Sequence, residues 1–407
     1  MSEFELCIVK VASFCNINCT YCYMFNANDR TFEHVPRFMS ERTSLQLLDR
    51  IGEYLETCGS KRFHVTLHGG EPSLWPKSNF LTFLSRVRDM NRAGYSLSVS
   101  LQTNGFRYDP ALFEILAEYA VSVGVSLDGP REHNDRRRVT HRGTGSYDRI
   151  MANVEKILRG PGAKILQGFL AVADPAIAPL DFLNWVGSLP ITRMDLIWPM
   201  EFSYRYPPWG IGDEAEYRAA PIYGRWFADV FDAWMKRDDP DIYIRHFFDC
   251  IEHYMGSARH IESIVNDRVP MFVVNTDGQY EYHDYFRPHA DGMCRTSANL
   301  ADNPISNLLH DPIFGQLLAL SEHLPEECRG CDVAAICGGG FLPGRTGGRP
   351  GMPRSVLCHD QNHFFTRVRE SLERLGVAPA PGRATTAAPI LRPLIMSHNV
   401  TQICPAA

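Results

Sequence analysis

The sequence predicts an α/β fold, a partial (β/α)6 TIM-like barrel followed by a smaller cysteine-rich extension. Two observations indicate the barrel. Short β-rich runs alternate with amphipathic segments from Phe4 to about Pro199, and this alternation implies a parallel sheet with right-handed crossovers. There are about six such units, rather than the eight of a closed barrel. The expected strands are Leu6–Ala12, Phe63–His68, Ser96–Gln102, Ser122–Leu127, Lys164–Ala171 and Met194–Trp198; the expected helices between them include Ser40–Cys58, Asn79–Arg92, Pro110–Tyr119 and Ser146–Arg159.

Composition excludes several classes of function. The 407 residues are 44% apolar and 22% charged, as in an ordinary folded protein. The net charge is −6 and the run Arg136–Arg138 is short, so we expect no nucleic-acid partner. No apolar run has the length of a membrane span and the start lacks a signal-peptide pattern, so we expect no membrane association and a cytoplasmic location. The 12 cysteines are then metal ligands or reactive thiols rather than a disulfide framework.

Three of these cysteines, Cys15, Cys19 and Cys22, follow the first expected strand with the spacing C-x3-C-x2-C. A [4Fe–4S] cluster takes four ligands, so three thiolates leave one iron open to another ligand. The alternatives are a zinc knuckle or unrelated core cysteines, but the loop offers no fourth Cys or His for zinc. With Tyr21 before the last Cys, the spacing resembles the signature of the radical S-adenosylmethionine (SAM) enzymes. The resemblance implies that SAM binds the open iron and is split to a 5′-deoxyadenosyl radical, which abstracts hydrogen.

Polar motifs follow the next expected strands, at the strand ends where barrels of this kind bind ligands. Gly69-Gly70-Glu71 after the second strand lets the backbone approach a ligand closely, and it resembles the GGE motif that holds the SAM amino group. Arg138, in a D-x-x-R pattern, offers a guanidinium for the SAM carboxylate. The other SAM contacts that the resemblance implies are Tyr21, Gln102 and Ser126, with Asp128 supporting a turn. The alternative for each is an ordinary cap or turn residue.

The middle of the chain is rich in aromatic residues, most of them expected in packing and some at a peptide entrance. It leads into helices expected at Tyr217–Met235 and Tyr243–Met255. Met271–Tyr285 is expected to form a β-hairpin around the turn Thr276–Gln279. Removing a hydrogen atom and an electron from a substrate leaves a proton to be taken up, so a carboxylate base is expected nearby. Asp284 is the first candidate for this base and Asp277 the second, against the alternative of ordinary turn acids.

A second cysteine set lies late in the chain, and its spacing alone fits either zinc or a [4Fe–4S] cluster. The iron–sulfur signature that precedes it favours iron. The stretch from Gly278 resembles the SPASM extension of peptide-modifying radical SAM enzymes, which usually carries seven Cys and two auxiliary clusters. Here His283 and Phe341 stand where that pattern has Cys. We therefore expect one auxiliary [4Fe–4S] cluster and roughly eight irons per chain. Its ligands would be Cys328, Cys331, Cys337 and Cys358.

Within this group, the resemblance is closest to the cyclophane-forming peptide maturases, through Lys10–Cys15, Pro36–Ser40, His141–Ser146 and Ser355–Cys358. It implies an oxidoreductase that joins an aromatic ring carbon to an unactivated Cβ of a ribosomally made precursor peptide. It also implies an electron donor such as flavodoxin or ferredoxin. The alternatives are thioether formation, epimerisation, or Cys or Ser oxidation as in sulfatase maturation. In a different class, the alternative is a non-enzymatic iron–sulfur carrier.

Four regions are expected along the chain. They are a radical SAM partial barrel at 1–230, bridging helices and the hairpin at 231–290, a SPASM-like auxiliary cluster domain at 291–375, and an Ala/Pro-rich tail at 376–407. No separate leader-binding domain is evident before Phe4, so peptide recognition is expected to use the body of the protein or a partner. Cys250 and Cys294 are too few to rebuild a second auxiliary cluster.

Overall fold

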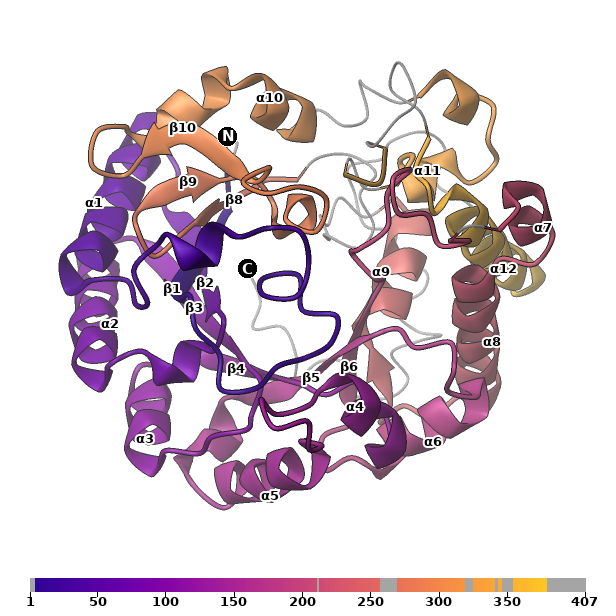
Figure 1. The fold of residues 1–407 in the computed structure, drawn as a ribbon, viewed down its shortest axis with the longest axis horizontal. Coiled ribbons are helices and arrows are strands. Elements are labelled where there is room, and N and C mark those ends of the chain that lie inside the picture. The colour runs from indigo at the N-terminus through magenta and orange to yellow at the C-terminus, as the bar shows by residue number, and fades with distance from the viewer. Residues whose placement is uncertain are drawn as a thin grey trace.

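The computed structural model describes residues 4–210, 212–256, 269–318, 325–340, 343–345 and 354–378. Within these residues a sheet of ten strands carries the fold, in the order β10-β9-β8-β1-β2-β3-β4-β5-β6-β7 (Figure 1). The strands β7 and β10 are its edges, so the barrel is open. The strands are β1 Leu6–Ala12, β2 Arg62–Gly69, β3 Ser96–Thr103, β4 Ser122–Ser126, β5 Leu166–Val172, β6 Arg193–Ile197, β7 Tyr243–Ile244, β8 Met271–Val274, β9 Gln279–Glu281 and β10 Arg295–Asn299.

The parallel core of this sheet confirms the predicted fold class. All pairs from β8 through β1 to β7 are parallel, and the six predicted strands are β1 to β6, each displaced by at most two residues at either end. Side chains alternate along each strand, so one set faces the helices and the other faces the barrel interior. On β2, for example, Phe63, Val65 and Leu67 are buried, while the positions between them are partly accessible.

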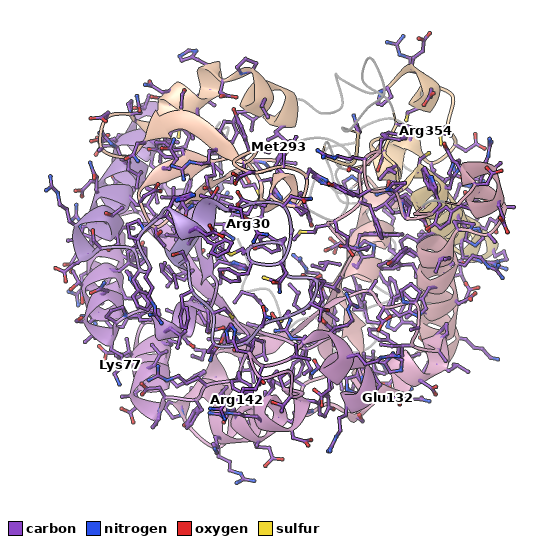
Figure 2. The ribbon with its side chains drawn as sticks, viewed as in Figure 1. Arg30, Lys77, Glu132, Arg142, Met293 and Arg354 are labelled. Carbon is purple, nitrogen blue, oxygen red and sulfur yellow. The ribbon has the colours of Figure 1, made fainter. Side chains whose placement is uncertain are left out.

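Helices surround the sheet on its outer side (Figure 1). The first begins where predicted, because Ser40 accepts a hydrogen bond from the backbone N–H of Thr43, an N-cap, and it ends at Gly59 in the left-handed conformation. Charged side chains such as Lys77, Glu132 and Arg142 point outward from the rim (Figure 2). The helices are α1 Glu41–Cys58, α2 Lys77–Arg92, α3 Pro110–Glu118, α4 Arg131–Arg137, α5 Tyr147–Leu158, α6 Pro179–Ser188, α7 Glu214–Ala219, α8 Ile222–Arg237, α9 Arg245–Tyr254, α10 Pro312–Leu318, α11 Ala334–Cys337 and α12 Cys358–Arg374.

The middle of the chain differs from its prediction in two places. The helix expected at Tyr217–Met235 is two helices, α7 and α8, because Pro221 lacks the N–H that a continuous helix needs. The helix expected from Tyr243 starts two residues later, after the short strand β7 pairs with β6. These elements form an aromatic layer in which Trp198 stacks on Phe227 with 4.0 Å between ring centroids.

The predicted hairpin is part of the barrel sheet. β8 and β9 pair antiparallel as expected, with Val273 opposite Glu281. However, β8 also pairs in parallel with β1, Leu6 lying opposite Met271 and Val9 opposite Val274. The hairpin therefore extends the sheet past its first strand, rather than bridging between regions. The predicted domain limits stay predictions, and residues 379–407 of the expected tail lie outside the described residues.

No helix in the described part of the chain has both the length and the apolar character needed to cross a bilayer.

Candidate active site

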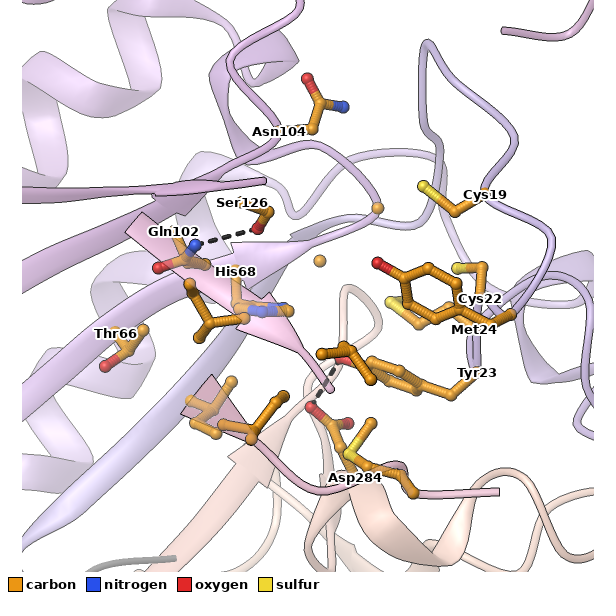
Figure 3. Close-up of a pocket in the computed structure, with 18 of the residues that line it drawn as sticks. Cys19, Cys22, Tyr23, Met24, Thr66, His68, Gln102, Asn104, Ser126 and Asp284 are labelled. Carbon is orange, nitrogen blue, oxygen red and sulfur yellow. Dashed lines mark hydrogen bonds between the residues drawn. The ribbon is translucent and has the colours of Figure 1, made fainter. Parts of the chain in front are cut away.

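A cavity of about 500 Å³ occupies the barrel interior and opens at the C-terminal ends of the parallel strands (Figure 3). The loop after β1 crosses this mouth (Figure 1). The cavity gathers side chains from β1 to β6 and from the segment after β9. Residues predicted for the site that line it are Cys15, Cys19, Tyr21, Cys22, Gly69, Gly70, Glu71, Gln102, Ser126, Arg138 and Asp284.

The three early cysteines lie together on the loop after β1. All three are free thiols at the cavity wall. Burial raises the pKa of Cys15 to about 12, with smaller contributions from the charges of Glu71, Cys22 and Cys19. The same cause raises the pKa of Cys22 to about 11. Three clustered thiols suit the thiolate side of an iron–sulfur cluster, and iron binding would displace their protons.

Two glycines let the end of β2 pass close beside the cysteine loop. A Cβ on Gly69, whose φ is +136°, would lie 2.2 Å from the carbonyl oxygen of Ala12, and one on Gly70 would lie 2.3 Å from that of Phe14. The Gly70 N–H donates to Ala12 over 2.7 Å. The sequence suggested that these glycines allow close approach of a ligand. The contacts that require them here are with the protein's own backbone.

Glu71 joins the ends of β2 and β3. Its buried carboxylate accepts hydrogen bonds from the Thr103 hydroxyl at 2.6 Å, the Asn104 N–H at 2.8 Å and the Ser73 N–H at 3.0 Å. Burial raises the pKa of Glu71, although these donors oppose the rise. The Asn104 amide in turn donates to the sulfur of Cys15 at 3.4 Å. Glu71 thus holds Asn104, whose side-chain amide contacts the cysteine loop.

Tyr21 lies between a carboxylate and a guanidinium. Its hydroxyl donates to Asp128 at 2.6 Å and accepts from Nη1 of Arg138 at 2.9 Å. Burial opposes the charge on Arg138, but Cys19, Tyr21 and Asp128 hold its pKa well above the usual value. The Nε of Arg138 is buried without a hydrogen-bond partner. A cavity cation with an unsatisfied donor fits a carboxylate ligand, as the resemblance implies for SAM.

Gln102 and Ser126 face one another across neighbouring strands. Nε2 of Gln102, near the end of β3, donates to the hydroxyl of Ser126 on β4 at 2.9 Å (Figure 3). Both side chains line the cavity. Asp128 accepts a further hydrogen bond from the N–H of Val172, so this carboxylate ties β4 to β5 as well as holding Tyr21. The predicted SAM contacts are therefore brought to one side of the cavity.

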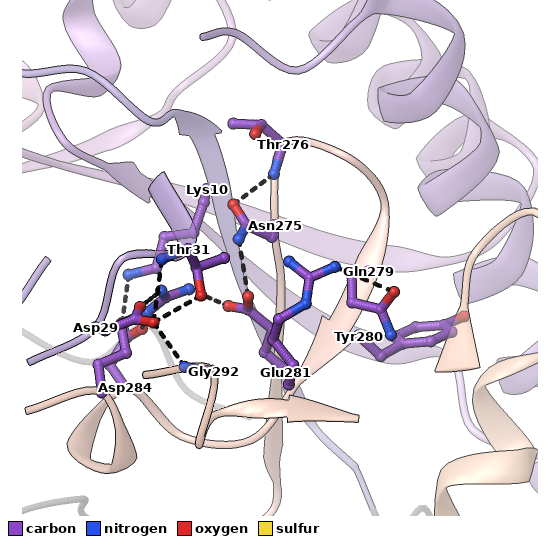
Figure 4. A network of polar contacts seen from close by, with 12 residues as sticks. Lys10, Asp29, Thr31, Asn275, Thr276, Gln279, Tyr280, Glu281, Asp284 and Gly292 are labelled. Atoms are coloured by element: carbon purple, nitrogen blue, oxygen red, sulfur yellow. Dashed lines mark hydrogen bonds and ion pairs between the residues drawn. The ribbon is translucent and has the colours of Figure 1, made fainter. Parts of the chain in front are cut away.

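On the other side of the cavity, Asp284 belongs to a buried network of charges (Figure 4). Asp284 pairs with Lys10 on β1 and with Arg287, whose guanidinium also pairs with Asp29 and Glu281. The network holds two cations and three carboxylates, all nearly inaccessible. Burial alone would raise the pKa of Asp284, but Lys10 and Arg287 together hold it below its usual range. Asp284 is therefore ionised, and the two cations that keep it ionised also lower its affinity for a proton.

Tyr23 and His68, which the sequence did not single out, contact Asp284 or its partner Lys10. The Tyr23 hydroxyl donates to Asp284 at 3.1 Å, and Lys10 reaches the Tyr23 hydroxyl at 3.0 Å and Nδ1 of His68 at 3.2 Å. Lys10 left a signal in the sequence, because a lysine inside the apolar run Leu6–Ala12 needs a buried partner.

Asp277 lies elsewhere. It caps the hairpin turn by accepting from the N–H of Gln279 at 3.0 Å, and it pairs with Arg295 at 2.9 Å. Asp277 does not line the cavity. We therefore keep only Asp284 as the candidate base, and Asp277 has the ordinary turn role that was its alternative.

The four late cysteines also come together. Besides burial, the charges of Cys358 and Cys328 raise the pKa of Cys337 to about 12, and those of Cys328 and Cys331 raise the pKa of Cys358 to about 11. Four neighbouring thiols fit a cluster ligated entirely by protein. Phe341 lies outside the described residues, and His283 lines the main cavity rather than this site. Among the residues described, no three His, Cys, Asp or Glu side chains are grouped as ligands of a single metal ion.

A glycine turn and one arginine shape the loop after Cys337. Gly338, Gly339 and Gly340 have φ of +59°, +78° and +77°, which side-chain-bearing residues rarely adopt. The guanidinium of Arg345 donates to the carbonyl oxygens of all three, at 2.6, 3.1 and 2.9 Å. This arrangement accounts for the Gly-Gly-Gly run and Arg345 in the sequence, and it holds the backbone beside Cys337 in place.

Comparisons with known proteins agree with this geometry. The family model described as "Radical SAM superfamily" matches residues 9–160. A serine-type anaerobic sulfatase-maturating enzyme of Bacteroides thetaiotaomicron is 26% identical over 384 residues, covering 89% of this chain and 88% of that protein. A cysteine-type enzyme of Clostridium novyi is 21% identical and covers 90% and 96%.

A solved structure described as native anSMEcpe with bound AdoMet and Cp18Cys peptide superposes with a TM-score of 0.75 at 20% identity. The superposition covers 91% of this chain and 98% of that one, so the two share a fold over most of their length. The family model covers the strand and loop that carry Cys15, Cys19 and Cys22, together with the strand ends that carry Glu71 and Ser126. Residues 9–160 therefore match the radical SAM superfamily, and the chain is similar over nearly its whole length to anaerobic sulfatase-maturating enzymes.

Proposed function

We propose that this protein is a radical SAM enzyme that oxidises a side chain of a peptide or protein at Cβ, and that the target is a Cys or Ser residue. One observation carries the proposal. The cavity that holds the three cysteines and Arg138 also holds an ionised carboxylate, Asp284, beside Tyr23. The residues that would hold the hydrogen-abstracting cofactor and the candidate base therefore line the same cavity.

The cofactors follow from the residues that fit them. Cys15, Cys19 and Cys22 would hold a [4Fe–4S] cluster, and Arg138, positioned by Tyr21, would hold the SAM carboxylate. When bound and reduced, this pair supplies a primary carbon radical strong enough to take hydrogen from an unactivated Cβ. The late cysteines would hold one auxiliary [4Fe–4S] cluster, and an external electron donor such as flavodoxin or ferredoxin would reduce the first.

The chain's own residues complete the oxidation. For a Ser substrate, the radical that bound SAM supplies would take the Cβ hydrogen atom, and Asp284 would take the hydroxyl proton. An auxiliary cluster held by Cys328, Cys331, Cys337 and Cys358 would accept the one remaining electron, so that the side chain would become an aldehyde. Lys10 and Arg287 keep Asp284 ionised before the step, and Tyr23 orients it through a 3.1 Å hydrogen bond.

The relatives support Cys or Ser oxidation better than the crosslinking that the sequence favoured. The relatives are a serine-type and a cysteine-type anaerobic sulfatase-maturating enzyme, and the similarity to each spans nearly the whole chain. Cyclophane formation is a second candidate because His283 stands where the seven-cysteine SPASM pattern has Cys. Both reactions begin with a radical at Cβ. In the oxidation this radical loses an electron, whereas in the crosslinking it joins an aromatic ring carbon.

The test uses the anaerobically reconstituted full chain with SAM, dithionite and two synthetic peptides. One is a sulfatase-derived peptide, made in a Ser form and a Cys form at its target position, and the other has an aromatic residue two positions before a residue with an unactivated Cβ. An aldehyde on the first peptide, trapped by a hydrazine, supports the proposal, with a target Ser→Ala peptide as control. A product of the second peptide that lacks two hydrogens and resists hydrazine would establish the crosslinking candidate instead. SAM consumption with neither product would overturn both.

A further inference from the structure

The barrel interior below Asp284 is polar on the side of β2 and β3, although Leu6, Ile8 and Leu170 line the same cavity. Small TIM-type barrels fill the whole of this space with branched apolar side chains. On β2 the inward positions carry His64, Thr66 and His68, because successive side chains alternate between faces. On β3 the neighbouring inward positions carry Ser98 and Ser100. Such a set needs a reason, since burying hydrogen-bonding groups costs free energy unless they are paired.

Four of these side chains form one hydrogen-bonded row, which we name the hydroxyl–imidazole row: Thr66, Ser100, His64 and Ser98. The Thr66 and Ser100 hydroxyls lie 3.1 Å apart, and the Ser100 hydroxyl lies 2.8 Å from Nε2 of His64. Nδ1 of His64 lies 2.7 Å from the Ser98 hydroxyl. Thr66, Ser100 and His64 line the cavity, whereas Ser98 is exposed at the N-terminal side of the sheet. The row therefore connects the cavity to solvent.

The upper end of the row approaches the candidate base. Lys10 pairs with Asp284 and contacts Nδ1 of His68 at 3.2 Å. His68 and Thr66 face the cavity from the same strand (Figure 3). Two residues of strand span about 7 Å, so one or two water molecules would have to bridge His68 and Thr66.

We propose that protons released at Asp284 leave the enzyme through Lys10, His68 and the hydroxyl–imidazole row, emerging at Ser98. This inference rests on the proposed oxidation, because that reaction releases one proton per turnover. With SAM and a peptide filling the mouth of the barrel, a route through its floor lets the proton reach solvent without opening the site. Hydroxyls and a neutral imidazole both donate and accept, so each member of the row passes a proton on as it takes one up.

Only bonds to hydrogen change along this route, and no electron moves. The substrate proton goes to Asp284, Lys10 gives one proton to His68 and takes that of Asp284. His68 releases a proton from its other nitrogen to water, which passes it to Thr66, and the Thr66 hydroxyl gives its own proton to Ser100. His64 takes a proton on Nε2 from Ser100 and releases one from Nδ1 to Ser98. Burial lowers the pKa of His64, which keeps its resting ring neutral and able to do this.

The test compares His64→Ala and Ser100→Ala with Ser85→Ala in the full, reconstituted enzyme. Ser85 is a matched control because its hydroxyl also bonds a hydroxyl, that of Tyr119 at 2.7 Å, but on the outer helices. We expect the two row variants to form oxidised peptide roughly tenfold to a hundredfold more slowly, and to make less product per 5′-deoxyadenosine. Added imidazole should restore the rate of His64→Ala, which a merely structural role would not allow. Ser85→Ala should match the wild type.

Two results would overturn the route. One is a wild-type rate in both row variants, and the other is a slow His64→Ala enzyme that imidazole does not accelerate. If His64→Ala folds poorly, Ser100→Ala still decides the test. Wild-type turnover in Ser100→Ala would by itself refute the route, because this substitution removes one member of the row. The proposed function fails in a different way, since a wild-type enzyme that cleaves SAM but oxidises no peptide would refute the oxidation itself.

Discussion

Lys10 and Asp284 form a buried ion pair although 274 residues separate them in the chain. The pair joins β1 to the segment after β9, and it sets both the charge state of the candidate base and the position of the hairpin. Burial lowers the pKa of Lys10, and Asp284 only partly offsets this effect. Lys10 therefore needs the carboxylate of Asp284 to offset the effect of burial on its charge.

Replacing Lys10 by Met should destabilise the protein by about 3–5 kcal/mol, because it leaves Asp284 buried with only Arg287 to balance it. Urea unfolding of the anaerobic protein measures the loss. A matched control is Arg86→Met, which breaks the exposed 2.9 Å pair with Asp49 and should cost less than about 1 kcal/mol. Equal losses of unfolding free energy in the two variants would show that the buried pair stabilises the protein no more than the exposed pair does.

Tyr21→Phe should weaken SAM binding by about tenfold or more. The variant keeps the ring but removes the hydroxyl that holds Arg138 and Asp128, and a hydrogen bond to a charged group contributes about 1.5–3 kcal/mol. Equilibrium dialysis with labelled SAM gives the dissociation constant. Tyr119→Phe removes a hydroxyl on the outer helices and should leave this constant unchanged. A wild-type dissociation constant for SAM in Tyr21→Phe would mean that Arg138 binds SAM without help from the Tyr21 hydroxyl.

Cys331→Ser should lower the iron content from roughly eight to roughly four per chain and abolish the oxidised peptide, while part of the SAM cleavage remains. The late cluster would then be needed to accept the last electron. Iron analysis and chromatography of 5′-deoxyadenosine measure the two effects. Cys294→Ser is the control, because Cys294 is buried beside Glu281 and Arg287 rather than among the late cysteines. Full product from Cys331→Ser would refute the electron-accepting role.

Stability should fall in mild acid through His246. Burial, with a smaller effect of Arg245, lowers the pKa of His246 from 6.5 to about 3, so the unfolded chain binds a proton that the folded one does not. The free energy of unfolding should therefore drop by about 1.4 kcal/mol as the pH falls from about 7.5 to about 5.5. His246→Gln should lose this part of the pH dependence, as followed by urea unfolding at each pH. His34→Gln, at an exposed position, should keep it. A slope unchanged in His246→Gln would contradict the assignment.

The barrel could be predicted from sequence because its signals are local. β1 appears at the predicted residues, since a buried parallel strand is a short apolar run bounded by a loop. The cysteine spacing likewise fixes which thiols meet, because one loop carries all three. The limits of α1 are also local signals, because the residue types of its N-cap, Ser40, and of its end residue, Gly59, are typical of helix ends.

What the sequence did not reveal depends on contacts between distant segments. Nothing near Met271 indicates that β8 pairs with β1, and nothing near Arg287 indicates that it meets Asp29. Asp277 and Asp284 look alike as hairpin acids, yet only the turn from β9 into the barrel brings Asp284 to Lys10. The row that ends at Ser98 escaped notice because alternating Ser and His residues on strands also suit a solvent-facing sheet.

The pairing of β8 with β1 also has a consequence for synthesis on the ribosome. β1 emerges first, but the strand that covers its second edge begins at Met271. At 5–20 residues per second, roughly ten to fifty seconds pass before that strand is made. During this interval Lys10 has no carboxylate from Asp284, and the unpaired edge of β1 is open to association with other chains. Metal loading of the loop that follows β1 would therefore occur on a nascent chain whose barrel is not yet complete, or wait until the hairpin has docked.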